Sequence, residues 1–381
     1  MEFAWTPEQA AYQERIRSIV ADNLPDDWWE NYAHDGPSSP QLMEFARKFG
    51  RKLAETGDVA SHWPKEYGGR GTNAWEHIIL SEEMWSEGEP RSSLYMGSNW
   101  AGPAIMAFGT EEQKLEHLGR ICQGEVLWCQ GFSEAESGSD LVSLRCSAER
   151  VEDGYVINGR KIWTSYAHSA DWMFLLARVS GRKHEGITCF LVPMNTPGLS
   201  VRTIKALHMT DDFHESTFDN VHLPFSSLIG EEGKGWEVVT ALMHNERVSA
   251  AQYELAERGL EQAVRILKER GQFEDAAVRA QAAACMAECD AGRLLTYRVV
   301  DDRVKNAPAS ATTSMARIAM IRGLQAVANF IADNLPGELS DRGHGRLRWV
   351  FKFAQGVGIA AGAYEIQLNL IGERHLGMPK G

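Results

Sequence analysis

The spacing of hydrophobic residues changes twice along the chain. Up to about residue 125, apolar positions recur every three or four residues between polar turns, as they do in amphipathic helices. Short runs rich in β-branched and aromatic residues follow, and helical periodicity returns at Gly233 and lasts to the end. The pattern predicts an α+β chain that is mainly α, with a helical domain over 1–125, a β domain over 126–231 and a second helical domain over 232–381.

The middle segment is expected to contain strands because β-branched and aromatic residues dominate several of its short runs. These runs are 155–165, 171–179, 186–194, 199–207 and 216–224. Asp153-Gly154 and Asn158-Gly159 are dipeptides typical of two-residue hairpin turns. In the last segment, dense helix formers predict long helices over 253–271 and 276–300.

The beginning of the sequence predicts a capped helix and no secretory signal. Thr6 is a good N-cap, Pro7 suits the first helical position, and Gln9 can close a capping box. No apolar run approaches the roughly 20 residues that a membrane-spanning helix needs. We therefore expect a cytoplasmic protein that does not use a membrane as a partner.

Composition and charge narrow the classes of function. The 381 residues are 44% hydrophobic and 24% charged, which is ordinary for a globular protein. A net charge of -13 argues against nucleic-acid binding but leaves room for a small phosphate-bearing ligand held by a few arginines. The six cysteines are scattered, and Cys285 and Cys289 have no second Cys or His pair, so reduced thiols are expected and no metal site.

One carboxylate lies where helical spacing predicts a buried face. Counted at that spacing, the stripe that contains Glu246 also holds Val239, Leu242, Met243, Ala250, Tyr253 and Leu260. No cation stands three or four residues away to make a surface ion pair. The spacing alone leaves two interpretations open: a catalytic base with a raised pKa, or a structural acid in a buried polar network.

Two further stretches could approach a ligand. The run WCQGFSEAESGSDLVSLR (128–145) is rich in Gly and hydroxyl residues, as in ligand-binding loops and also in plain surface turns. Trp163, Thr164 and Ser165 end a predicted strand, where the indole could stack on a planar ring or fill the core. GVGIAA (356–361) fits a dinucleotide-binding pattern, but it does not follow a strand in a βαβ unit, so we discount it.

Taken together, several motifs resemble the acyl-CoA dehydrogenase family. GFSEAESGSDLVSLR (131–145) and NGRKIWTS (158–165) are similar to the middle domain, WPKEYGG (63–69) to an N-terminal loop, and YEIQLNLIGERHLGMP (364–379) to the C-terminal signature. The resemblance implies an N-terminal helical domain, a middle β-barrel-like domain and a C-terminal four-helix bundle. It also implies FAD held between the last two domains and across a subunit interface. The implied reaction oxidises an acyl-CoA to the trans-2-enoyl-CoA and passes electrons to an electron-transferring flavoprotein.

The same resemblance suggests residues for the flavin ring. Phe132 and Ser133 would lie at the ring, with the Ser133 hydroxyl bonding its pyrimidine edge. Ser139 would lie near the flavin and the CoA chain. Trp163 would flank the ring, and Ser165 would approach N5, the atom that accepts hydride.

The segments expected to hold the FAD phosphates match less well. Arg270 in ERGQF (269–273) would reach the pyrophosphate of a neighbouring subunit's FAD, a charge that suits an arginine fork. The glycine usual after this motif is Glu274. The second FAD segment is replaced by ADNLPGELSD (332–341), and the arginine usual after EIQ is Leu368.

The resemblance also resolves the role of Glu246. Many family members carry the catalytic glutamate in the C-terminal signature, where this chain has Ala361. A second family pattern places the base directly before an arginine, and HNERVS (244–249) matches it. Glu246 would then be the α-proton base and Arg247 would lie near the CoA, while the backbone NH of Ala361 would polarise the thioester carbonyl.

Several assemblies and activities remain open at this point. The chain could be a self-sufficient homotetramer, or the catalytic partner in an α2β2 heterotetramer of the kind some bacterial relatives use on steroid side chains. It could also be a structural, non-catalytic subunit, or a relative that oxidises a substrate other than a thioester. The acyl group itself is not defined by these residues.

Overall fold

The computed structural model describes residues 4–32, 38–207, 212–246, 250–307, 310–340 and 344–379, and the side chains of α7 only as far as Leu242. The chain is 55% helical and has the fold expected from the resemblance, with helical regions before and after a mixed β-sheet. It divides into two compact units. One contains 1–36, 72–90 and 247–381, and the other contains 37–71 and 91–246.

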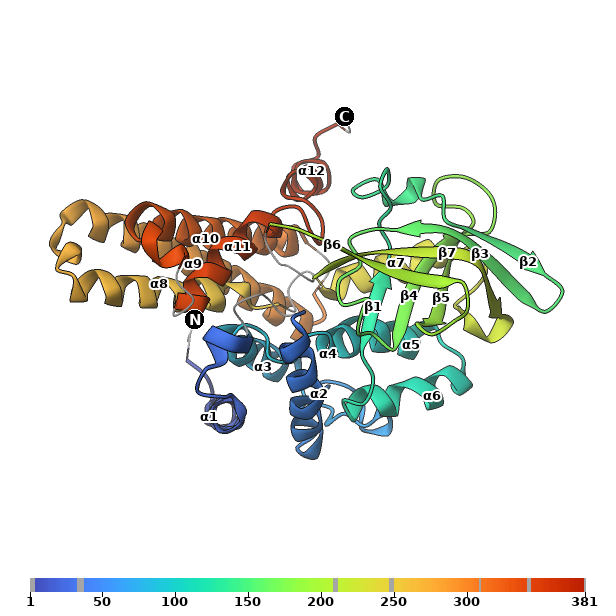
Figure 1. Cartoon of the computed structure of the whole chain (residues 1–381), viewed down its shortest axis with the longest axis horizontal. Coiled ribbons are helices and arrows are strands. Elements are labelled where there is room, and N and C mark those ends of the chain that lie inside the picture. The colour runs from blue at the N-terminus through green and yellow to red at the C-terminus, as the bar shows by residue number, and fades with distance from the viewer. Residues whose placement is uncertain are drawn as a thin grey trace. The chain divides into compact units, whose positions relative to one another are not determined.

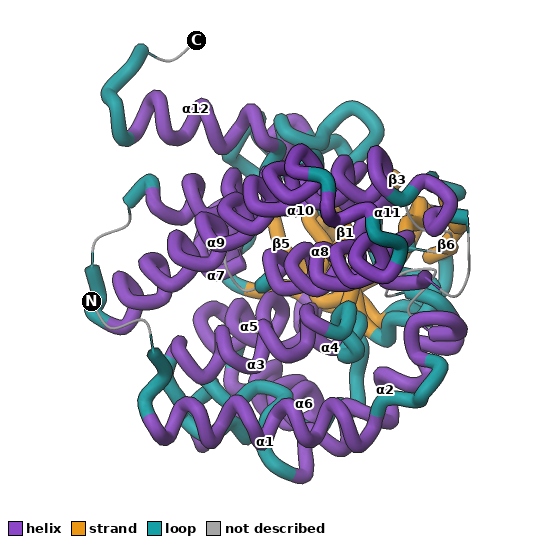
Figure 2. Tube along the Cα trace, turned by 90° about the vertical axis from the view of Figure 1, so that its left-hand side faces the viewer, coloured by secondary structure: helices purple, strands orange, loops and turns teal. Residues whose placement is uncertain are grey.

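The first unit, called the helical unit here, is built around long helices near the C-terminus. Its elements are α1 (Pro7–Asn23), η1 (Trp28–Tyr32), α3 (Ala74–Ser86), α8 (Gln252–Glu269), η6 (Gln272–Glu274), α9 (Ala276–Val304), α10 (Thr312–Asn334), η7 (Pro336–Leu339), α11 (Gly345–Val357) and α12 (Tyr364–Arg374). Figures 1 and 2 show α8, α9, α10 and α11 side by side. The predicted long helices are therefore confirmed as α8 and α9.

The predicted capping box is confirmed at the first helix. Thr6 Oγ1 accepts a hydrogen bond from the Gln9 amide at 3.2 Å, and Gln9 Oε1 accepts one from the Thr6 amide at 3.0 Å. Pro7 occupies the first helical position, where its missing N–H costs nothing. These contacts fix where α1 begins.

A buried carboxylate joins three helices of the helical unit. Glu82 on α3 accepts hydrogen bonds of 2.8 Å from the hydroxyls of Tyr253 on α8 and Tyr297 on α9. Burial, with the nearby Glu254 carboxylate, raises the pKa of Glu82 to about 8, while the two tyrosines and Arg293 act in the opposite direction. The core of this unit therefore contains an acid that favours its neutral form.

Protonation of Glu82 should make stability depend on pH. The pKa of Glu82 rises from 4.5 to about 8 on folding. Its contribution to the free energy of unfolding is therefore fully present below pH 4.5 and is lost as the pH rises through 8. We expect the thermal unfolding midpoint to fall between about pH 5 and about pH 9, and to fall less in Glu82→Gln. Glu261→Gln, which changes an exposed carboxylate on α8, should keep the wild-type slope. Equal slopes in all three proteins would contradict this account.

The second unit, called the sheet unit here, packs helices with one mixed sheet. Its helices are α2 (Pro40–Glu55), η2 (Lys65–Tyr67), α4 (Leu94–Met96), η3 (Gly97–Ala101), α5 (Gly102–Phe108), α6 (Glu111–Cys122), η4 (Leu141–Ser143), η5 (Phe225–Ser227) and α7 (Gly235–Glu246). Its strands are β1 (Trp128–Gly131), β2 (Ser147–Val151), β3 (Gly154–Lys161), β4 (Trp172–Arg178), β5 (Ile187–Pro193), β6 (Leu199–Ile204), β7 (Phe213–Pro224) and β8 (Leu228–Ile229). They follow the order β6-β7-β3-β2-β4-β5-β8, and β1 pairs in parallel with β4.

All five predicted strands are present, as β3 to β7, whereas β1, β2 and β8 were not predicted from the pattern. A hairpin is present at the predicted place, but its two turn residues are Glu152 and Asp153, because Gly154 already pairs with Val151 as the first residue of β3. The turn predicted at Asn158-Gly159 is wrong. These residues lie inside β3 at a shift of register, where Gly159 has φ 144° and an added Cβ would come 2.8 Å from Cys146 Cα. The glycine serves a bulge and a close approach between strands.

The two units cut across the first predicted segment. Helices α1 and α3 belong to the helical unit, whereas α2 and α4 to α6 belong to the sheet unit. Helix α7 also belongs to the sheet unit, although its periodicity continues into the last segment of the sequence. The placing of domain boundaries at residues 125 and 231 stays a prediction.

Three further expectations concern the cysteines, metal sites and membrane-spanning helices. Each of the six cysteines is buried and reduced, including Cys285 and Cys289 on α9. Within the described ranges, the acidic, His and Cys side chains form no cluster suited to a metal ion. The described helices also include none with the length and apolar character needed to span a bilayer.

Candidate functional site

The sheet unit brings the two middle-domain motifs together at the ends of β1 and β3. Lys161 Nζ donates to the Phe132 carbonyl at 3.0 Å, and the Ile162 amide donates to the Ser133 carbonyl at 2.9 Å. Phe132 and Ser133 therefore lie beside residues 161–162, which directly precede Trp163. Two segments about thirty residues apart in sequence form one continuous surface.

A buried ion pair holds this junction. Lys161 is fully buried, and its ammonium lies 2.7 Å from Glu134 Oε1. The Glu134 carboxylate also accepts hydrogen bonds from the amides of Arg145 at 2.7 Å and Cys146 at 2.8 Å. A buried charge is tolerated only when paired and hydrogen-bonded, so this pair fixes both ends of the polar loop 134–146. This pair was not predicted from the sequence, although a lysine among the alternating apolar residues of β3 was a usable signal.

The backbone after β3 is strained where it presents Trp163. Trp163 has φ 59° and Tyr166 has φ 66°, values that bulky L-residues rarely adopt. The Trp163 side chain is 52% exposed and makes an edge-to-face contact with Phe213, with ring centroids 5.6 Å apart. Ser165, half-buried, follows it. Strained backbone and an exposed indole are features of ligand sites, and this surface can stack on a planar ring and bond its edge.

Buried polar groups of β7 hold the Trp163 loop from behind. The Thr164 amide donates to the His214 carbonyl at 3.0 Å, and His214 Nδ1 lies 3.2 Å from the Thr164 carbonyl. The Tyr166 amide donates to the Asp212 carbonyl at 3.3 Å. Burial raises the pKa of the Asp212 carboxyl to about 6, against a hydrogen bond donated by the Ser38 hydroxyl. These contacts keep the strained loop in one conformation.

Ser139 lies on a separate part of the polar loop. Its neighbour Ser137 is buried and donates to the carbonyls of Asp140 at 2.9 Å and Leu141 at 3.3 Å, which closes the turn around Gly138 and Ser139. Ser139 itself is exposed. The turn presents its hydroxyl to solvent.

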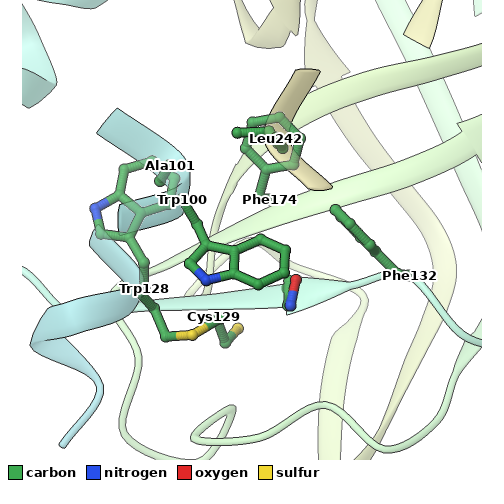
Figure 3. Close-up of a pocket in the computed structure, with 9 residues that line it drawn as sticks. Trp100, Ala101, Trp128, Cys129, Phe132, Phe174 and Leu242 are labelled. Atoms are coloured by element: carbon green, nitrogen blue, oxygen red, sulfur yellow. The ribbon is translucent and has the colours of Figure 1, made fainter. Parts of the chain in front are cut away.

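A small apolar pocket, with room for about one water molecule, lies within the sheet unit (Figure 3). Its walls come from α4, η3, β1, β4 and α7, and the lining residues are Met96, Trp100, Ala101, Trp128, Cys129, Gln130, Phe132, Phe174 and Leu242. Phe132 adjoins the strained aromatic surface described above, and Leu242 is four residues before Glu246 on α7. The lining is apolar, and its bulky side chains leave little free volume.

The predicted base lies at the end of α7. The helix ends at Glu246, whose side chain lies outside the described residues, as does the whole of Arg247. The prediction of one continuous apolar stripe through Glu246 is wrong, because Tyr253 and Leu260 belong to a separate helix, α8. Just before α8 begins, the Ala251 amide donates to Ser81 Oγ on α3 at 3.1 Å.

In the helical unit, Arg270 already has an anionic partner. Its guanidinium forms an ion pair with the Glu338 carboxylate of η7, whose side chain is 10% exposed. Glu338 lies within the segment ADNLPGELSD that departs from the family pattern. Glu274 follows in η6 and adds a further negative charge. The negative charge of these carboxylates makes this surface poorly suited to bind an anion.

Ala361 lies in a tight loop between α11 and α12. Its φ is 53°, and Gly362 follows with φ 85°. The Tyr364 amide donates to the Gly358 carbonyl at 2.9 Å, and Gln367 Nε2 donates to the Gly362 carbonyl at 3.3 Å. GVGIAA thus covers a helix end and this loop, so discounting it as a dinucleotide motif is confirmed. Ala361 is exposed, with its backbone held from both sides.

Comparison with known families gives three matches in chain order. Residues 6–125 match the acyl-CoA dehydrogenase N-terminal domain, 129–221 match the middle domain, and 233–376 match the C-terminal domain. The matched segments include every candidate site residue named above.

Individual proteins extend the likeness over the full chain. IpdE1, an acyl-CoA dehydrogenase of Mycobacterium tuberculosis, is 30% identical over 375 residues, which is 97% of each chain. FadE34, an acyl-CoA dehydrogenase of the same organism, is 35% identical over 334 residues, or 86% of this chain and 46% of FadE34. The chain therefore spans about half the length of that relative. The solved structure of the Tcur3481-Tcur3483 steroid ACAD is 26% identical, covers 100% of both chains, and superposes with a TM-score of 0.93.

Proposed function

Because the chain belongs to the acyl-CoA dehydrogenase family, whose members are oxidoreductases, we propose that it converts an acyl-CoA thioester to the trans-2-enoyl-CoA. One observation carries this proposal: the apolar pocket reaches from Phe132, beside the strained Trp163 surface, to Leu242 on α7. An acyl chain would need this small pocket to widen, and it would then have the candidate flavin surface at one end. The helix that carries Glu246 would form the opposite wall.

Glu246 is proposed as the base that removes the α-proton. Positions 242 and 246 are one turn apart on α7, and the proposal places the Glu246 carboxylate on the helix face that carries Leu242. A carboxylate at this position could accept the α-proton as a general base. Arg247 and Ser139 are proposed to contact the CoA portion. The Ala361 amide is proposed to donate to the thioester carbonyl.

The family is FAD-dependent, and the residues of the sheet unit fit the ring of that cofactor. The exposed indole of Trp163 offers a stacking face, and Ser133 and Ser165 offer hydroxyls close to it. The Lys161–Glu134 pair and the β7 contacts hold these groups in place. When bound, FAD would supply the acceptor for the β-hydride at N5.

The helical unit fits the FAD phosphates poorly. An arginine that reaches a pyrophosphate should be available to it, yet Arg270 is paired with Glu338, and Glu274 adds like charge to the phosphates. This observation favours an α2β2 assembly in which a different subunit completes each flavin site. The similarity to the Tcur3481-Tcur3483 steroid ACAD supports the same choice. A homotetramer that binds its own FAD is the alternative, and an electron-transferring flavoprotein is the proposed acceptor in either case.

The test is the flavin content of the purified chain and its response to thioesters. We expect well below one FAD per chain when the protein is produced alone, and a gain in FAD when a partner subunit is co-produced. Bleaching of the bound flavin by fatty or steroid side-chain acyl-CoAs would support dehydrogenation and identify the acyl group. One FAD per chain in the isolated protein would contradict the mixed assembly. Flavin that no acyl-CoA bleaches would contradict the proposed reaction.

A further inference from the structure

Arg317 joins three parts of the helical unit from the middle of α10. The side chain is 4% exposed. Its Nη2 donates to the carbonyls of Val357 at 2.7 Å and Ala360 at 3.1 Å, and its Nη1 donates to Gln252 Oε1 at 3.0 Å. One buried cation therefore caps the end of α11, holds the loop that follows, and ties both to the first turn of α8.

The contact with Ala360 determines where the next amide points. The Ala360 carbonyl and the Ala361 N–H belong to the same peptide unit, and in a trans peptide these two groups point in opposite directions. With the carbonyl directed at Arg317 inside the unit, the N–H must point away from it. A hydrogen bond from a cation to the carbonyl also polarises the peptide, which makes its N–H a stronger donor.

The Ala361 N–H is placed to serve an external acceptor. In the described part of the chain it donates to no other residue. Ala361 is exposed, and its φ of 53° is uncommon for a residue with a side chain, so the surrounding contacts must hold it. Arg317 on the carbonyl before it and Gln367 on the carbonyl after it supply that restraint.

We propose that Arg317 is a positioning residue, which directs and polarises the Ala360–Ala361 peptide so that its N–H binds the carbonyl oxygen of the acyl-CoA thioester. The inference rests on the proposed function, since it needs a thioester at that amide. Arg317 touches neither substrate nor cofactor in this role. Its bond to Gln252 adds rigidity by anchoring the same guanidinium to α8.

The test uses Arg317→Lys, which keeps the charge but cannot hold three acceptors in the same geometry. Gln252→Met is a milder variant that removes only the link to α8. Arg322→Lys is the matched control, since Arg322 lies on the same helix, is 56% exposed and pairs with Glu288. Each chain, in its flavin-loaded assembly, is mixed with the 3-thia analogue of an acyl-CoA, which has an acidic α-proton and no β-hydrogen to lose.

Two readouts separate positioning from general structure. The carbonyl stretch of the bound thioester should move toward its free frequency in Arg317→Lys, and exchange of its α-proton with deuterium oxide should slow about tenfold. Gln252→Met should cause a smaller change in the same direction, and Arg322→Lys should cause none. An unchanged carbonyl frequency in Arg317→Lys, with flavin retained, would overturn the proposal.

A failure of the proposed function would look different. In that case wild-type protein would neither exchange the α-proton nor shift the carbonyl band. Amide hydrogen exchange in the unliganded chain tests the restraint independently. Residues 358–363 should exchange faster in Arg317→Lys than in Arg322→Lys, and equal rates would overturn the role of Arg317 whatever the substrate.

Discussion

Glu246→Gln should lower the rate of acyl-CoA oxidation by about 10³- to 10⁴-fold while leaving the flavin bound, because an amide cannot accept the α-proton. The substitution keeps the size of the side chain and introduces no charge. The thioester should still bind with similar affinity. The measurement is the rate of flavin bleaching in a single anaerobic turnover.

A matched control lies on the same helix. Glu237 is an exposed carboxylate in the first turn of α7, and Glu237→Gln should oxidise substrate at the wild-type rate. If Glu246→Gln bleached its flavin as fast as the wild-type protein, another group would have to be the base. Loss of activity in both variants would point to a disturbed helix instead of a lost base.

Lys161→Met is expected to destabilise the chain by about 3–5 kcal/mol, because it leaves the Glu134 carboxylate buried without its cation. Lys161 also donates to the Phe132 carbonyl, so the surface proposed for the flavin ring should lose its shape. We expect a lower midpoint of denaturant unfolding and a loss of bound flavin. Both are measurable on the purified protein without knowledge of the substrate.

Two comparisons make the Lys161 prediction specific. Lys234→Met removes an exposed ion pair with Glu231 in the same unit and should cost no more than about 1 kcal/mol. The double variant Lys161→Met/Glu134→Gln should recover part of the loss, since the uncompensated charge is gone. A double variant as unstable as the sum of the two single variants would argue against direct coupling between the pair.

Local patterns predicted much of the fold. The capping box at Thr6 and the hairpin before Gly154 depend on residues a few positions apart, and runs of β-branched and aromatic residues identified β3 to β7. The short strands β1 and β2 were missed because their runs contain polar residues. They are strands because they pair with β4 and β3, which supply partners that no local pattern reveals.

Long-range contacts explain what sequence patterns could not predict. The Ala251 amide, just before α8, donates to Ser81 Oγ, 170 residues earlier in the chain. The Lys161–Glu134 pair and the three bonds of Arg317 likewise join residues that are distant in sequence. The motifs identified Phe132, Ser133, Trp163 and Ser165 as candidates. The structure adds what holds these residues, and it pairs Arg270 with Glu338.

The most direct test of the central claim is the product formed from an acyl-CoA. Flavin-loaded protein, with its partner subunit if one is required, should be mixed anaerobically with an acyl-CoA deuterated at C2 and C3, and the thioester analysed by mass spectrometry. The account predicts a trans-2-enoyl-CoA that has lost one deuterium from C2 and one from C3. The Glu246→Gln variant should form almost none of this product. Recovery of unchanged thioester at full flavin occupancy, or loss of deuterium at other positions, would contradict it.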